Sequence, residues 1–167
     1  MAYRNKTFVS FASEDLTSYR LMQAWKANQH IDFDFLDAHD INTALDSSQP
    51  ATIERRLTDR LANTKQVVML IGDATRRKAG DGVSFLHHEA TVIKKLKLPV
   101  IFANLNGSRV VESSRLPFSL SEQYTISVSF QPAIIKYALD DFVDGFVYSP
   151  DKGPHHYKSH VYSNLGI

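Results

Sequence analysis

One acidic side chain stands among residues that are otherwise expected to be apolar. Residues 84–98, SFLHHEATVIKKLKL, predict an amphipathic helix, because Phe85, Val92, Ile93 and Leu96 recur at helical spacing. At about 100° per residue, Glu89 falls inside this apolar stripe. A buried leucine there would contribute roughly 1.5 to 3 kcal/mol. A carboxylate in its place therefore points to a chemical or an electrostatic role.

Two structural explanations for Glu89 stay open beside a catalytic one. An acid near the start of a helix is stabilised by the helix dipole by about 0.3 to 1 kcal/mol. An inward-facing acid is also often paired with a cation. Glu89 is not part of a capping box, because His87 takes the reciprocal position when Ser84 is the N-cap.

Short apolar segments alternate with segments of helical periodicity along the chain. The predicted strands cover residues 6–12, 31–37, 65–73, 98–107 and 124–130. One predicted helix begins at Pro50, with Ser47 and Ser48 as candidate N-caps, and the last begins at Pro132. This alternation predicts an α/β fold: a flavodoxin-like, doubly wound parallel sheet of about five strands in the order 2-1-3-4-5.

Length and composition narrow the class of protein. The 167 residues predict one domain over residues 1–148 and a polar tail over residues 149–167, which is expected to wrap the surface or to be partly mobile. The formal charge of +1 argues against nucleic acid and anionic membranes as partners. No apolar run approaches the roughly 20 residues of a membrane span, and no signal-like segment begins the chain. These features predict a cytoplasmic protein.

Several kinds of site are excluded or disfavoured. The chain has no cysteine, which rules out disulfides, thiolate chemistry and cysteine-ligated metals. It also lacks the glycine-rich phosphate loops of ordinary dehydrogenases and P-loop nucleotidases. A basic strip on the second predicted helix is interpreted as a solvated face: Arg55, Arg56 and Arg60.

The predicted topology locates a crevice. In doubly wound sheets, ligands bind beyond the carboxyl ends of the strands, where the winding reverses between the first and third strands. The loops over residues 11–15, 37–49 and 72–84 are expected there. Glu89 lies one turn into the helix that follows the last of these loops, so it is expected beside the crevice.

Several of these segments together resemble a known family. TFVSFASEDLTSYRLMQAWK, FDFLDAHD and TKQVVMLIGDATRR, followed by a glutamate in the next helix, resemble the bacterial TIR-like family, which includes the TIR component of Thoeris anti-phage defence systems. The resemblance extends from about Lys6 into the final helix, PAIIKYALDDF. It implies the same α/β fold and an enzymatic activity, cleavage of the nicotinamide–ribose bond of NAD.

The resemblance also assigns roles. It implies that Glu89 is the catalytic residue and that Phe85 stands where the family usually has the tryptophan of a Trp-x-x-x-Glu pattern. The products would be nicotinamide and ADP-ribose, or a cyclic or conjugated ADP-ribose signal that activates a nucleotide-sensing effector. NAD would be the substrate, and no cofactor is implied.

The chemistry explains why such a reaction needs a carboxylate. Loss of nicotinamide builds positive charge on the ribose, as in glycosidases, and a carboxylate in a dry cleft stabilises that charge. Phe11 and Phe85 are candidates to stack on substrate rings, and the Ser13 hydroxyl is a candidate for ribose or phosphate oxygens. Asp37, at the end of the second predicted strand, either lines the crevice or forms a turn.

Other polar groups favour structural roles, so no metal site is predicted. Glu14 and Asp15 are interpreted as caps of the first helix rather than as metal ligands. His87 and His88 are expected to be exposed, with His88 nearer the apolar stripe. A tail cluster would suit zinc only on a regular helix, whereas the tail predicts irregular structure: His155, His156 and His160.

Two other functions remain open. One is a non-catalytic TIR-like module that assembles with copies of itself or with other TIR domains through residues 37–49 and adjacent helices. The other is a receiver-like phosphoacceptor built on Glu14, Asp15 and Asp73. Receivers carry a lysine after the fourth strand, where this chain has asparagine, leucine and asparagine at residues 104–106, and this difference weakens the second alternative.

Overall fold

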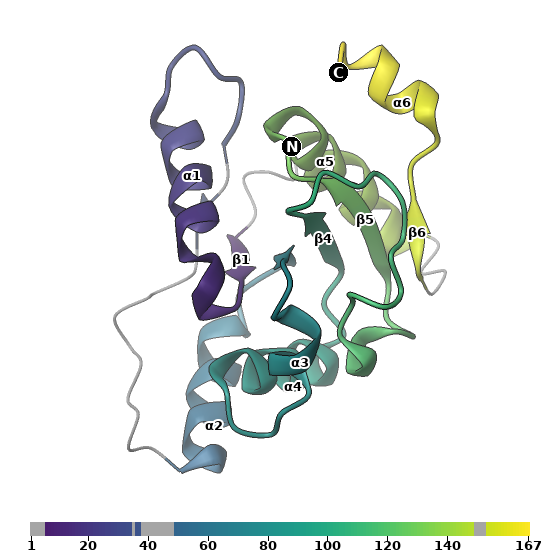
Figure 1. Ribbon diagram of the computed structural model, residues 1–167. Coiled ribbons are helices and arrows are strands. Elements are labelled where there is room, and N and C mark those ends of the chain that lie inside the picture. Colours follow the sequence, from purple (N-terminus) through teal and green to yellow (C-terminus); the bar gives the residue numbers. More distant parts are fainter. Residues whose placement is uncertain (1–5, 35, 38–48, 149–152) are drawn as a thin grey trace.

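A parallel sheet forms the centre of the molecule (Figure 1). The computed structural model describes residues 6–34, 36–37, 49–148 and 153–167. Within these residues the strands lie in the order β2-β1-β3-β4-β5-β6, and every neighbouring pair is parallel. The strands are β1 (Lys6–Ser10), β2 (Leu36–Asp37), β3 (Gln66–Ile71), β4 (Val100–Asn104), β5 (Thr125–Ser129) and β6 (His155–His156). The predicted α/β class and its parallel sheet are confirmed.

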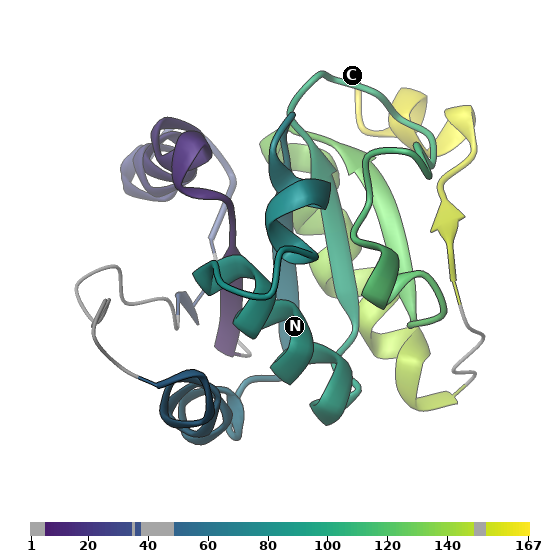
Figure 2. The same cartoon turned by 60° about the horizontal axis from the view of Figure 1, so that its bottom comes forward.

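Helices cover both faces of this sheet. They are α1 (Leu16–Ala27), α2 (Pro50–Leu61), α3 (Thr75–Ala79), α4 (Phe85–Leu96), α5 (Pro132–Tyr148) and α6 (Ser159–Asn164), with short 3-10 helices η2 (Ser13–Asp15) and η3 (Phe118–Leu120). Apolar side chains of α1 and α5 share one core cluster, and those of α2 and α4 share the other. Figure 2 shows α2 and α4 as neighbours on their face of the sheet.

The side chains of β1 alternate between these two clusters. Phe8 belongs to the α2–α4 cluster and Val9 to the α1–α5 cluster. Because successive side chains of a strand point to opposite faces, Ser10 returns to the α2–α4 face. The last residue of β1 therefore offers a hydroxyl to α4.

The second strand is much shorter than the sequence predicts. Residues 31–37 were expected to form it, but of the residues in this range that the structure describes, 31–34 and 36–37, only Leu36 and Asp37 do so. Phe33 is buried in the core instead, edge-on to Trp25 with 5.6 Å between ring centroids. Alternating apolar residues show which side chains are buried, but they do not show whether the backbone pairs with a neighbouring strand.

The predicted helix starts are partly confirmed. Ser84 is the N-cap of α4, and its Oγ accepts a hydrogen bond of 3.3 Å from the His87 N–H. Pro50 is the first residue of α2, and Gln49 is its N-cap residue. The candidate caps Ser47 and Ser48 lie outside the described residues.

The C-terminal segment contributes to the fold. β6 pairs with β5, and the Tyr162 side chain of α6 is fully buried in the α1–α5 cluster. The Tyr162 hydroxyl accepts a hydrogen bond of 3.1 Å from the Ser129 N–H, and the Arg109 guanidinium lies 4.3 Å from the centre of the Tyr162 ring. The expectation of a surface or mobile tail is wrong for Tyr162, because one large aromatic ring can anchor a polar segment. The domain boundary at residue 148 stays a prediction.

No helix in the described part of the chain combines the length and the apolar character that crossing a bilayer requires.

We expect Tyr162→Ala to lower the free energy of unfolding by about 3 kcal/mol or more, because it leaves a cavity where a fully buried ring had been. Urea denaturation measures the loss. The control is His160→Ala, which removes an exposed ring from the same helix and is expected to change stability little. Equal stability of the two variants would show that α6 is not anchored in the core.

Candidate functional site

The Glu89 carboxyl group is buried at the carboxyl end of β1. Glu89 as a whole is 6% exposed, and its Oε2 atom accepts a hydrogen bond of 2.5 Å from Ser10 Oγ. Ser10 ends β1, and β1 pairs with β2 on one side and β3 on the other, so the carboxyl group lies where the winding reverses. The predicted inward orientation of Glu89 is confirmed.

Burial strongly affects the ionisation of Glu89. Loss of hydration raises the pKa of Glu89 from 4.5 to about 8, while the Ser10 hydrogen bond and the positive charge of Arg60 act in the opposite direction. Glu89 forms no salt bridge with any described residue. The structure therefore supports neither the ion-pair explanation nor simple stabilisation by a helix dipole, which would favour the charged form.

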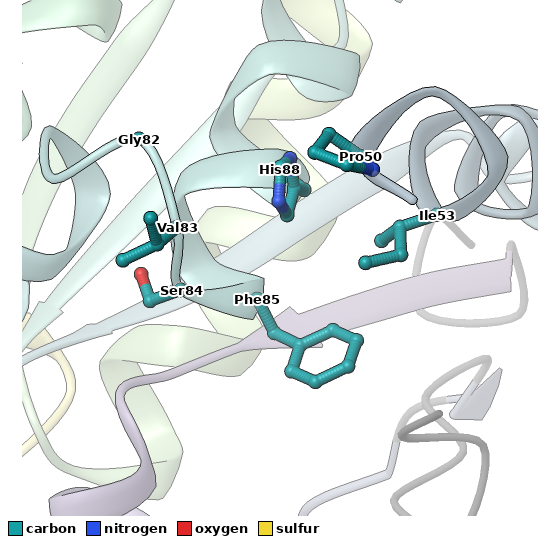
Figure 3. Close-up of a pocket in the computed structure, with 7 residues that line it drawn as sticks. All are labelled: Pro50, Ile53, Gly82, Val83, Ser84, Phe85 and His88. Atoms are coloured by element: carbon teal, nitrogen blue, oxygen red, sulfur yellow. The ribbon is translucent and has the colours of Figure 1, made fainter. Parts of the chain in front are cut away.

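A hollow opens between the first turns of α2 and α4. Its volume is about 340 Å³, near the lower end of the roughly 300 to 1,000 Å³ typical of ligand pockets. Figure 3 shows the residues that line it: Pro50, Ile53, Gly82, Val83, Ser84, Phe85 and His88. Glu89 is not among these lining residues, but it directly follows His88 and lies one helical turn after Phe85 in α4.

Phe85 lines the hollow rather than the core. The apolar stripe was expected to include it, but the buried face of α4 is centred on other residues: Leu86, Glu89, Ala90 and Ile93. Figure 3 shows the Phe85 ring extending away from the body of α4. An aromatic side chain is thus available at the hollow, as the predicted substrate-binding role requires, and that role stays a prediction.

Phe11 lies on the other face of the sheet from Phe85. Its ring stacks on Tyr19 of α1, with 4.7 Å between centroids and 19° between ring planes, and it packs against the α1–α5 cluster. The structure therefore does not bring Phe11 together with Glu89. The reason is the alternation along β1, which directs Ser10 and Phe11 to opposite faces.

Of the two other predicted substrate-binding residues, Ser13 lies three residues after the end of β1 and Asp37 is the last residue of β2. Ser13 is in η2, and its Oγ accepts a hydrogen bond of 2.8 Å from Lys78 Nζ. Asp37 pairs in register with Thr7, which places its backbone at the β1–β2 junction. Their roles toward a substrate stay predictions.

His88 is buried, so the expectation of an exposed histidine is wrong. The residue is 2% exposed, and Nδ1 lies 3.0 Å from Glu54 Oε1 of α2. The sequence pattern placed His88 near the apolar stripe but could not show that α2 would supply a carboxylate to it. Only the contact between α2 and α4 creates this pair.

The acidic residues after β1 do not cap α1. Asp15 occupies the N-cap position of α1 but makes no capping hydrogen bond, so the predicted cap is wrong. Its carboxylate lies against Gly72 instead, where an added Cβ would be 2.5 Å from both carboxylate oxygens. Burial, followed by the charges of Glu14 and Asp73, raises the pKa of Asp15.

The other two acids of the receiver-like alternative, Glu14 and Asp73, form ion pairs with basic residues. Lys78 Nζ lies 2.6 Å from Glu14 Oε1 and lowers the pKa of Glu14 by hydrogen bonding, and Arg115 Nη1 lies 2.9 Å from Asp73 Oδ1. No group of three or more acidic or histidine side chains in the described ranges is arranged to hold a metal ion.

A parallel α/β domain with a buried glutamate in the second helix after the third strand is similar to TIR-like domains. The chain belongs to the family described as Thoeris protein ThsB, TIR-like domain, whose model matches residues 8–109. This match includes the last three residues of β1, the residues that line the hollow, and Glu89, and the family is associated with anti-phage defence. No curated protein matches the chain.

The raised pKa of Glu89 predicts a pH-dependent cost in stability. Between about pH 4.5 and pH 8 the folded protein retains a proton that the unfolded chain has released, so the free energy of unfolding falls as pH rises. Glu89→Gln keeps the shape of the side chain and cannot ionise. We expect its stability relative to the wild type to increase from pH 5 to pH 8.5, by up to a few kcal/mol.

Urea denaturation at several pH values measures this difference. Glu122→Gln makes the same chemical change at an exposed position and is expected to run parallel to the wild type. A difference between Glu89→Gln and the wild type that does not change with pH would contradict the raised pKa.

Proposed function

We propose that this chain is an NAD-consuming enzyme that cleaves the bond between nicotinamide and ribose, with Glu89 as the catalytic carboxylate. The observation that carries the proposal is the position of Glu89: a buried carboxyl group at the end of β1, one residue after His88 of the hollow, and without a salt bridge to any described residue. An acid of this kind is costly to the fold, and strongly shifted acids in clefts are candidates for catalysis.

The reaction requires little acid catalysis. When the bond between ribose C1′ and the ring nitrogen breaks, its electron pair moves to the ring, which leaves as neutral nicotinamide. Positive charge develops on the ribose, and ionised Glu89 stabilises it electrostatically. Water then adds to C1′ and releases a proton to give ADP-ribose, or a nucleophile within the same molecule closes a ring.

The raised pKa of Glu89 fits a cationic substrate. In the protein alone, burial outweighs the Ser10 hydrogen bond and the charge of Arg60, and it favours the protonated carboxyl group at neutral pH. The nicotinamide ring of NAD is positively charged, and a positive charge close to a carboxyl group favours its ionised form. Binding of NAD would therefore promote ionisation of the group that the reaction needs.

We expect Glu89→Gln to lower NAD turnover by about 100-fold or more while the fold is retained, because an amide cannot neutralise the developing positive charge. Chromatography of free nicotinamide measures turnover, with purified protein and in phage-infected cells that express it. Glu122→Gln is the matched control and is expected to keep full activity. Equal activity of Glu89→Gln and the wild type, or no NAD loss in either setting, would overturn the proposal.

The pH profile provides a separate test of the ionised form. We expect kcat/KM for NAD to rise with pH, with a midpoint near 8 set by Glu89 in the free protein. The midpoint of kcat is expected to be lower, because bound NAD favours ionisation. A flat profile between pH 6 and pH 9, with stable protein throughout, would contradict a role for ionised Glu89.

The assembly alternative rests on a part of the chain that the structure largely does not describe. Of residues 37–49, only Asp37 and Gln49 are described. Self-association, TIR–TIR assembly and a downstream nucleotide-sensing effector stay predictions.

A further inference from the structure

The hollow between α2 and α4 has two polar side chains in its lining, Ser84 and His88. The Ser84 hydroxyl already forms two hydrogen bonds. It donates one of 2.6 Å to the Lys78 carbonyl oxygen and accepts one of 3.3 Å from the His87 N–H. These two contacts hold the start of α4. Of the two polar side chains, His88 is therefore the one that can form a hydrogen bond with a ligand in the hollow.

Glu54 determines which nitrogen of His88 carries the proton. A carboxylate only accepts hydrogen bonds, so the 3.0 Å contact with Glu54 Oε1 requires the hydrogen to be on Nδ1. In the neutral ring, Nε2 is then a hydrogen-bond acceptor. Nε2 makes no hydrogen bond to any residue that the structure describes.

The rest of the lining suits a flat aromatic ring. Pro50 and Ile53 contribute apolar surface from α2, and Phe85 contributes an aromatic ring from α4 (Figure 3). A small aromatic ring that carries one hydrogen-bond donor would bury its faces against apolar atoms and satisfy His88 Nε2. Nicotinamide has this composition, because its carboxamide carries N–H donors.

We propose that this hollow is the subsite for the nicotinamide ring and that His88, oriented by Glu54, recognises the carboxamide through an N–H···Nε2 hydrogen bond. This inference rests on the proposed cleavage of NAD. His88 and Glu89 are consecutive residues, about 100° apart around α4. Glu89 does not line the hollow, so the carboxamide would lie at His88 while the ribose, attached to another ring atom, extends out of the hollow toward Glu89.

The same geometry rejects the corresponding acid. Nicotinic acid carries a carboxylate, which has no hydrogen to donate and directs negative charge at the Nε2 lone pair. A site built to pair with an N–H group discriminates strongly against a ligand that lacks it. The enzyme should therefore prefer NAD over nicotinic acid adenine dinucleotide.

The experiment compares kcat/KM for release of nicotinamide from NAD with that for release of nicotinic acid from nicotinic acid adenine dinucleotide. We expect the wild type to prefer NAD by at least about tenfold. In His88→Leu the preference should fall toward one, because leucine has no acceptor. In Glu54→Gln the side-chain amide can donate to Nδ1 and move the ring hydrogen to Nε2, so the preference should shift toward the acid.

A binding measurement separates recognition from turnover. Saturation-transfer NMR compares nicotinamide and nicotinic acid on Glu89→Gln, with and without His88→Leu, and thermal unfolding checks that each variant is folded. Glu122→Gln is the matched control for Glu54→Gln and should keep the wild-type preference.

The outcomes distinguish the inference from the proposed function. Two results would overturn the inference and leave the proposed function standing. Either the wild type cleaves NAD without preferring it over nicotinic acid adenine dinucleotide, or His88→Leu keeps the wild-type preference. If the wild type does not cleave NAD, the function is overturned and binding decides the inference. Selective binding of nicotinamide that His88→Leu abolishes supports it, whereas equal or absent binding of the two ligands overturns it.

Discussion

The hydrogen bond between Ser10 and the buried carboxyl group of Glu89 is the interaction on which the site depends. It joins the last residue of β1 to the second turn of α4 and places the carboxyl group where the winding of the sheet reverses. A leucine at this position would stabilise the core, whereas the carboxyl group must remain protonated or be ionised without hydration and without a salt bridge to a described residue. The fold therefore gives up stability at the position where a cationic substrate could restore a favourable interaction.

The elements around Glu89 create space beside it. Ser84 caps the start of α4, and Pro50 begins α2, so two helices start next to each other and leave a hollow between their first turns. The same two helices bring Glu54 to His88. A carboxylate that fixes the tautomer of a buried histidine makes the remaining ring nitrogen a defined acceptor, and a defined acceptor can distinguish an amide from an acid.

Phe11, Asp15 and the C-terminal segment have structural roles away from the proposed site. Phe11 belongs to the α1–α5 face, stacked on Tyr19, and Asp15 lies against Gly72 because that residue has no side chain. At the far edge of the sheet, β6 and the buried Tyr162 extend the fold beyond residues 8–109, which the family model matches. The chemistry that we propose is thus confined to the carboxyl end of β1 and the facing turns of α2 and α4.

The sequence by itself determined the α/β class, the helix that carries Glu89, its cap at Ser84 and the inward direction of the acid, because these follow from local periodicity and capping chemistry. Periodicity reports the side on which a residue lies but not its partner. Only the tertiary structure showed that Ser10 binds Glu89, that Glu54 binds His88 and that Phe11 and Phe85 lie on opposite faces. These facts depend on how strands and helices distant in sequence come together.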